Sequence, residues 1–193
     1  MALLGNWLTE RGWEVVSTRE PGGCPIAERI RAVVLSDASD EAGRGMTAEC
    51  EALLFAASRA QHVHDVILPA LNAGRIVLCD RFLDSSIVYQ GYGRELGEDF
   101  IRQINVPAQR ARPDGTFLYA IDEAEALSRA TRGGHADRIE AEGAAFQRRL
   151  RDAYAALREK EPERIRVLDG SGSIEEVFAR TQAAAADFLN TKE

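Results

Sequence analysis

The sequence lacks any hydrophobic run near the roughly 20 residues needed to cross a membrane, and it does not open with a charged-then-apolar leader. Histidine is scarce too, with three residues in 193. His62 and His64 are two positions apart, which places them on different faces of a helix, and His135 is isolated. We therefore expect neither a membrane-spanning segment nor a metal site built on histidine.

Cysteine is equally scarce. The chain has three, Cys24, Cys50 and Cys79, an odd number without the spacing of metal ligands. Each lies in an apolar or helical context, so we expect buried free thiols in a reducing cytoplasm.

Basic residues are outnumbered by acidic ones, 24 to 31, which gives a net charge of −7 and a pI near 5.1. This balance argues against a surface for a nucleic acid polymer, although it allows a local basic pocket. The hydrophobic content of 45% and the length of 193 residues fit one globular domain with a real core. We find no internal repeat and no linker between domains.

An apolar run that ends in a charged pair is the central feature of the chain. Residues 76–79 have the length and β-branched content of a buried parallel strand, and Asp80 and Arg81 follow directly. Ligands of open α/β sheets bind beyond the carboxyl ends of the strands. An Asp there can hold Mg²⁺ or its water, and an Arg can clamp a phosphate.

Hydroxyl and amide side chains follow this pair and are suited to contacts with a base and a sugar: Ser85, Ser86, Tyr89 and Gln90. A helix N-terminus capped by Asp84 or Ser85 is the alternative explanation. Capping accounts for one of these residues but not for the series, so the pattern favours a phosphate-and-nucleoside site.

Short apolar segments alternate with helical patterns, which predicts an α/β fold with a parallel sheet and helices on both faces. We expect strands at residues 13–18, 76–79, 116–121 and 164–168. We expect helices at residues 1–11, 25–35, 48–72, 85–92, 97–106, 139–160 and 174–189. Thr47 is the predicted N-cap of the third helix, and Pro69 is expected to kink it.

Four segments make the chain resemble thymidylate kinase, the nucleoside monophosphate kinase family that phosphorylates dTMP from ATP. They are residues 18–23 (Thr-Arg-Glu-Pro-Gly-Gly), 54–59 (Leu-Phe-Ala-Ala-Ser-Arg), 80–90 (Asp-Arg-Phe-Leu-Asp-Ser-Ser-Ile-Val-Tyr-Gln) and 137–140 (Asp-Arg-Ile-Glu). The resemblance extends from about Gly12 to the C-terminus. It implies a P-loop-NTPase-like nucleoside monophosphate kinase fold, a cytoplasmic homodimer, and ATP with Mg²⁺ as the phosphate donor.

The resemblance also implies roles for individual residues. Phe55 would stack on thymine, and Arg59 would hydrogen-bond the carbonyl edge of the base. A core aromatic is the alternative for Phe55, but Arg59 at i+4 lies on the same helix face and favours the site. Arg81 would hold the dTMP phosphate, and Arg31 and Glu20 would line the same pocket. For Arg31, a solvated helix face is the alternative.

The segment after the central strand would contact the nucleoside. By the same resemblance, Ser85, Ser86 and Gln90 would contact the base. Tyr89 would crowd the 2′ position and so favour deoxyribose. Asp80 would support Mg²⁺ through water.

The segment 129–138, which holds three arginines and two adjacent glycines, would form the family's basic lid. Arg129, Arg132 and Arg138 would close over ATP as charge develops on the transferred phosphate. A solvated loop is the alternative. Residues 169–172 would border the adenine.

One family motif is absent: no Gly-x-x-x-x-Gly-Lys-Ser/Thr sequence occurs in the chain. In the family this P-loop follows the first strand, and its backbone N–H groups cradle the donor phosphates. The resemblance places that strand upstream of Met1 and, in the sheet, between the expected strands at 76–79 and 116–121. The helix at residues 1–11 starts without an N-cap, as the remainder of a longer element would.

We therefore expect residues 1–193 to form a single thymidylate-kinase-like domain that is N-terminally truncated, with the first central strand missing. Such a chain would fold poorly and lack normal kinase activity. Three explanations would account for the missing segment: a start codon assigned too late, a deliberate truncation or a decayed gene. Two functional alternatives stay open, a non-catalytic dTMP-binding remnant and a kinase for another nucleoside monophosphate.

Overall fold

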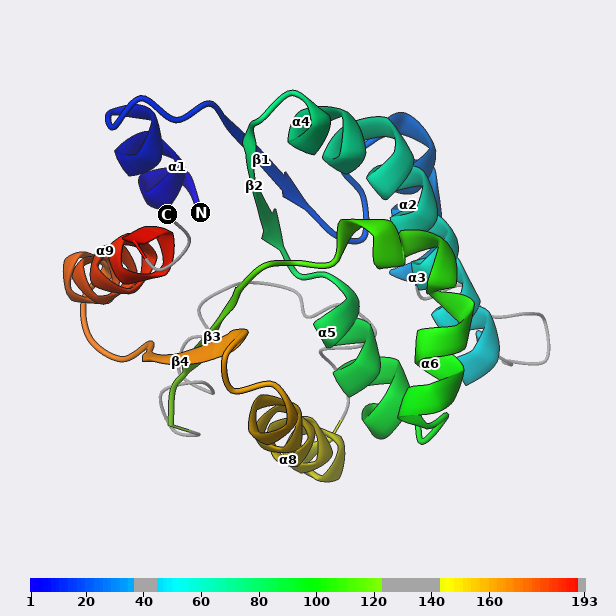
Figure 1. Cartoon of the computed structure of the whole chain (residues 1–193). Coiled ribbons are helices and arrows are strands. Elements are labelled where there is room, and N and C mark those ends of the chain that lie inside the picture. The colour runs from blue at the N-terminus through cyan, green and yellow to red at the C-terminus, as the bar shows by residue number, and fades with distance from the viewer. Residues whose placement is uncertain (37–44, 123–142, 191–193) are drawn as a thin grey trace.

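The computed structural model describes residues 1–36, 45–122 and 143–190, in which strands and helices alternate as expected (Figure 1). The strands are β1 (Val15–Arg19), β2 (Ile76–Asp80), β3 (Thr116–Ala120) and β4 (Ile165–Asp169). Helices flank these parallel strands, which confirms the predicted α/β class. The expected lid at residues 129–138 and the start of the helix at 139–160 lie outside the described residues.

The strands form two parallel ribbons instead of one continuous sheet. β1 pairs with β2 from Val15–Ile76 to Arg19–Asp80, and β3 pairs with β4 from Thr116–Ile165 to Ala120–Asp169. Within the described ranges β2 and β3 share no ladder. The break lies where the resemblance predicts an interior strand. Residues 76–79 are only partly buried, although their composition is that of a fully buried strand.

Helices lie on both sides of the β1–β2 ribbon (Figure 1). On one side, α1 (Ala2–Thr9) packs against β1 and against α9 (Ile174–Asn190). Leu4, Trp7 and Leu8 of α1 are buried in this contact. Met1 takes the N-cap position of α1 without a side-chain capping bond.

The other side is covered by α2 (Pro25–Val34) and by one long helical segment divided by a wider turn. That segment comprises α3 (Ala48–His62), a π-helical turn η1 (Val63–Ile67) and α4 (Leu68–Asn72). Thr47 caps α3 as predicted, because its hydroxyl accepts a hydrogen bond of 3.2 Å from the Cys50 N–H. The irregularity expected from Pro69 takes the form of η1, whose wider turn relieves the clash between the proline ring and the carbonyl four residues earlier.

A second helical group surrounds the principal core. It consists of α5 (Leu83–Ser86), a π-helical segment η2 (Ile87–Gly93), α6 (Glu98–Ile104), a 3₁₀ helix η3 (Val106–Ala111) and α8 (Ala144–Lys160). The expected helix at 85–92 is therefore largely π-helical, and η3 was not predicted. Gly93 is required where η2 meets α8, because an added Cβ would lie 2.7 Å from a ring carbon of Phe146.

The three cysteines are free, but they differ in exposure. Cys24 is buried, Cys79 is half-buried and Cys50 is exposed. The prediction of three buried thiols is wrong for Cys50, because this residue of the first turn of α3 faces solvent. None of the helices in the described ranges is long and apolar enough to cross a membrane.

Candidate functional site

A cavity of about 140 Å³ lies where β1 and β2 end. Chain segments that are far apart in sequence meet there: the loop after β1, α2, one face of α3, and the segment from the end of β2 into η2. All nine residues predicted to bind the substrate line the cavity: Glu20, Arg31, Phe55, Arg59, Arg81, Ser85, Ser86, Tyr89 and Gln90. The structure thus brings together Arg31 and eight residues that were selected from three separate motifs.

Glu20 connects the two strand ends at the floor of the site. Its backbone N–H donates a hydrogen bond of 2.9 Å to the Asp80 carbonyl at the end of β2. Its side chain is only 2% exposed and accepts a hydrogen bond of 2.7 Å from Arg59 Nε. The other carboxylate oxygen lies 3.0 Å from His62 Nδ1. Glu20 is therefore held by partners on both oxygens.

Arg59 is buried to the same degree, and each of its three side-chain nitrogens has a partner. Besides Nε, which donates to Glu20, Nη1 donates to Asn105 Oδ1 at 2.7 Å and Nη2 donates to Ser86 Oγ at 2.9 Å. A buried guanidinium loses its hydration, and this loss is offset only when its hydrogen bonds are complete. The network fixes the guanidinium at the cavity wall.

Two members of this network were missed by sequence reasoning. His62 is fully buried and bridges Glu20 and Thr18, with its Nε2 2.7 Å from the threonine hydroxyl. Its position three residues after Arg59, on the same helix face, was the available signal. Asn105 follows α6 and meets Arg59 across 46 positions of sequence, so no local pattern indicated it.

Arg81 has a left-handed backbone conformation, with φ of 63°. This conformation is unfavourable for a residue with a Cβ and recurs at functional sites. The guanidinium lies 5.1 Å from the centroid of the Tyr89 ring. Burial tends to lower the pKa of Arg81, but the neighbouring Tyr89 raises it above its ordinary value, so the group stays charged. A fixed cation therefore stands at the end of β2.

Asp80 precedes Arg81 and is exposed at the same strand end. Among the described residues, no group of three or more histidine, cysteine, aspartate or glutamate side chains is placed to hold a metal ion. Asp80 therefore contributes a single carboxylate to this edge of the site.

The segment after Arg81 does not use its polar side chains for capping. Phe82 takes the N-cap position of α5 without a side-chain bond, and Asp84 instead pairs with Arg164 at 2.7 Å. Ser85 Oγ lies 3.3 Å from the Tyr154 hydroxyl. The alternative of a simple capped helix start is therefore wrong for Asp84 and Ser85.

The remaining predicted residues are not part of this cavity. Arg129, Arg132 and Arg138 lie outside the described residues. Residues 169–172 form a turn after β4, in which the Ser171 N–H donates to Asp169 Oδ1 at 2.9 Å. No residue of this turn lines the cavity.

Comparison with known proteins agrees with the motifs. The family model for thymidylate kinase matches residues 1–181. The chain is 44% identical to the thymidylate kinase of Geotalea uraniireducens (strain Rf4), over 94% of this chain and 87% of that protein. It is 48% identical to the thymidylate kinase of Symbiobacterium thermophilum, over 91% of this chain and 80% of that protein.

A solved structure also points to the thymidylate kinase family. The crystal structure of thymidylate kinase from Ehrlichia chaffeensis superposes with a TM-score of 0.68 at 33% identity, covering 86% of this chain and 82% of that one. Motifs, cavity and relatives agree, and the chain belongs to the thymidylate kinase family.

Proposed function

We propose that this protein is a dTMP kinase, which transfers the terminal phosphoryl group of ATP to dTMP and so supplies dTDP for dTTP biosynthesis. The observation that carries the proposal is that all nine predicted substrate residues line one cavity. Family membership supports the same reaction.

The base would occupy the part of the cavity formed by α3 and η2. Phe55 supplies an aromatic face for stacking, and Arg59 offers N–H donors to a base carbonyl. Ser85, Ser86 and Gln90 offer the polar contacts beside it. Because the Glu20 network holds Arg59 in place, little ordering of that side chain accompanies binding.

The phosphate would lie beside Arg81, whose charge complements a phosphate monoester. Arg31 lines the same cavity and donates a hydrogen bond of 2.9 Å to the Pro21 carbonyl, so it is oriented toward the loop after β1. Tyr89, over which Arg81 lies, would crowd the 2′ position of the sugar. Phosphoryl transfer depends chiefly on such positioning and on charge neutralisation.

Mg²⁺ is the cation expected with ATP, and the donor chemistry of the site fits it. Asp80 offers one exposed carboxylate, and Mg²⁺ binds through one or two carboxylates while it keeps waters and phosphate oxygens as its other ligands. When bound, the ion neutralises phosphate charge. Asp80 would orient a ligand water, and Arg129, Arg132 and Arg138 are proposed as the arginines that cover the donor.

The sequence does not supply the family's binding loop for the ATP phosphates, because the P-loop motif is absent from the 193 residues. We therefore propose that this chain by itself binds dTMP but forms dTDP slowly or not at all. A cytoplasmic homodimer is part of the same proposal, on the strength of the family resemblance.

Binding of dTMP to the 193-residue chain, measured by isothermal titration calorimetry, tests the acceptor half of the proposal. We expect saturable binding that weakens at least about tenfold in Arg81→Ala, because a hydrogen bond to a charged group contributes about 1.5–3 kcal/mol. Arg75→Ala is the matched control, since Arg75 immediately precedes β2 and pairs with Glu14 instead of lining the cavity. Absence of dTMP binding by a chain that circular dichroism shows to be folded, or equal losses in the two variants, would reject the proposal.

An acceptor panel with ATP tests the reaction in an extended protein that includes a P-loop, because the 193-residue chain alone is proposed to form dTDP slowly or not at all. Formation of dTDP by the extended protein supports the kinase, whereas dTMP binding without turnover by that protein identifies the non-catalytic remnant. If the enzyme prefers a purine nucleoside monophosphate, that nucleotide and not dTMP is the substrate.

A further inference from the structure

A buried carboxylate that the proposed roles do not use lies behind the cavity. Glu51, in the first turn of α3, is 1% exposed and pairs with Arg94 Nη2 at 3.1 Å. Its Oε1 also accepts a hydrogen bond of 2.9 Å from Nε2 of Gln90. Gln90 is itself 1% exposed and lines the cavity. Glu51 is therefore in direct contact with a residue predicted to read the base.

The chemistry of this contact fixes which way the Gln90 amide points. An amide ends in a carbonyl that accepts hydrogen bonds and an NH₂ that donates them, and a half-turn exchanges the two at almost no change in shape. A carboxylate paired with a guanidinium only accepts. Glu51 therefore holds the NH₂ end of Gln90, and the carbonyl end is the one left for a ligand. The reversed amide would face Glu51 with oxygen against oxygen in a buried site, which is strongly unfavourable.

Arg59 adds hydrogen-bond donors to the same cavity wall, opposite in character to the acceptor from Gln90. Its Nη1 and Nη2 atoms each carry two N–H groups, and each donates one of them to Asn105 or Ser86. The cavity thus offers an acceptor from Gln90 and donors from Arg59. Thymine presents an N3–H donor next to a carbonyl acceptor. Cytosine presents the reverse at both positions, a bare N3 acceptor next to an amino donor.

We propose that Glu51 is a positioning residue that determines base specificity: by fixing the Gln90 amide, it makes the cavity accept thymine-type bases and reject cytosine. The inference rests on the proposed function, in that a pyrimidine nucleoside monophosphate occupies the cavity.

Calorimetric titration of the 193-residue chain with dTMP and with dCMP tests this role. We expect the wild type to bind dTMP at least about 100-fold more tightly than dCMP, because buried polar groups strongly reject a ligand that cannot pair with them. In Glu51→Ala the amide can turn, so we expect this ratio to fall at least about tenfold. Arg94→Lys is the control, since it keeps a cation beside Glu51 without altering the contact to Gln90, and its ratio should stay within about threefold of wild type.

The ratio separates this role from a structural one. Equal losses for both nucleotides in Glu51→Ala, or an unchanged ratio, would overturn the inference. If Glu51→Ala does not fold by circular dichroism, Glu51→Asp replaces it, because the shorter carboxylate stays near Arg94 but falls short of Gln90. The same fall in ratio is expected there, and a wild-type ratio would overturn the inference.

The wild type distinguishes the two proposals. A chain that does not bind dTMP rejects the proposed function itself. A chain that binds dTMP, with Glu51 variants of unchanged ratio, rejects only the role of Glu51.

Discussion

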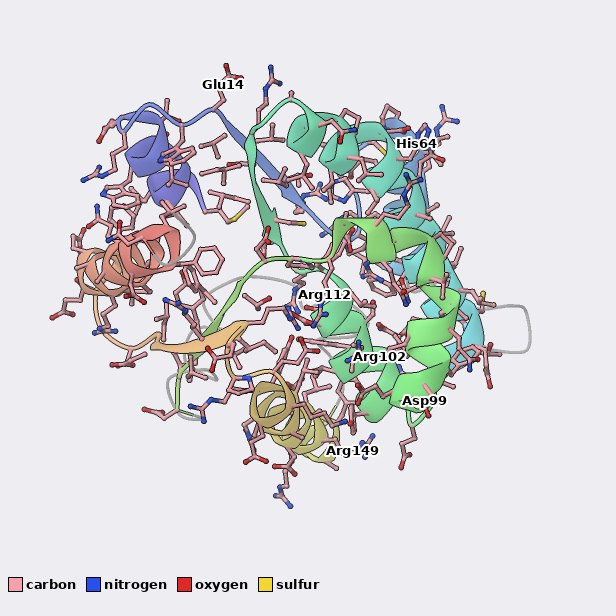
Figure 2. The ribbon with its side chains drawn as sticks, in the orientation of Figure 1. Glu14, His64, Asp99, Arg102, Arg112 and Arg149 are labelled. Carbon is pink, nitrogen blue, oxygen red and sulfur yellow. The ribbon has the colours of Figure 1, made fainter. Side chains whose placement is uncertain are left out.

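Two clusters of charged side chains join distant parts of the chain, and they differ in their access to water. In the cluster at the cavity wall, the Glu20 and Arg59 side chains are each 2% exposed. In the cluster between α6, α8 and β4, Glu98 and Glu161 are 16% exposed, but Lys160 and Arg112, which pair with them, are 52% and 67% exposed. Figure 2 labels Arg102 and Arg112, which donate to Glu161 together with Arg164.

The difference in burial determines how much each cluster can contribute to stability. A buried ion pair is rarely more stabilising than apolar residues of similar size, but removal of one partner is strongly destabilising. Stability alone therefore does not explain the Glu20–Arg59 pair, which agrees with the proposed role of Arg59 in binding the base. Arg164, which is 11% exposed, is the least solvated cation of the outer cluster. The pairs made by Lys160 and Arg112 are solvated and add little stability, so the main effect of the cluster is to tie α6 to the start of β4.

The largest expected effect comes from breaking the inner pair. In Arg59→Met, Glu20 keeps His62 as a partner but loses its guanidinium, so we expect unfolding to require about 3–5 kcal/mol less free energy. Urea denaturation followed by circular dichroism measures the change. The double variant Glu20→Gln/Arg59→Met removes both charges and should recover much of the loss. A double variant as unstable as the single one would contradict this explanation.

The outer cluster should respond to acid. Burial tends to raise the pKa of Glu98, but hydrogen bonds from Lys160 and Arg102 hold it at about 2. Burial acts likewise on Glu161, whose pKa is held at about 2 by Arg164 and Arg112. Because both values lie below the ordinary 4.5, the stabilisation is complete above about pH 4.5 and is lost as pH falls toward 2.

We expect this loss to be about 1–2 kcal/mol for the cluster, since solvent screens the exposed partners. Urea midpoints between pH 6 and pH 3 would measure it. The variant Glu98→Gln/Glu161→Gln should show a flatter pH dependence over that range. If its slope equals that of the wild type, these two carboxylates are not responsible.

The smallest effect should come from an ion pair in full solvent. Glu14 and Arg75 lie 2.8 Å apart at the starts of β1 and β2, with exposures of 73% and 47%, and Figure 2 shows Glu14 projecting from the surface. Glu14→Ala should change the unfolding free energy by less than about 0.5 kcal/mol. If thermal or urea denaturation shows a loss of more than about 1 kcal/mol in unfolding free energy, exposed pairs are not weaker than buried ones and the comparison fails.

Much of the fold was predictable from sequence, because apolar strands and capped helices leave local signals. The four strand positions agree with the structure to within two residues. The π-helical segments were not predictable in the same way: η1 and η2 widen the turn, so a 3.6-residue period read through Val63 or Ile87 loses register with the actual faces. Within the described residues β2 and β3 share no ladder, whereas the truncation and the poor folding of the chain stay predictions.

The cavity residues could be identified because they lie in contiguous motifs with chemistry suited to a nucleotide. For His62 the only local signal was its spacing of three residues from Arg59. Glu51 and Asn105 had none, since each contacts other side chains and does not line the cavity. Such residues are identified by burial and by partners that folding brings near, and neither is encoded in local spacing.

The backbone conformation of Arg81 has a consequence for protein engineering. At a φ of 63°, glycine and asparagine have a lower backbone conformational energy than arginine. Arg81→Gly should therefore relieve about 1 kcal/mol of strain. A library screened only for heat resistance would therefore enrich replacements at this position. Such a screen would discard the cation proposed to hold the phosphate, and the most heat-resistant clones would then bind dTMP most weakly.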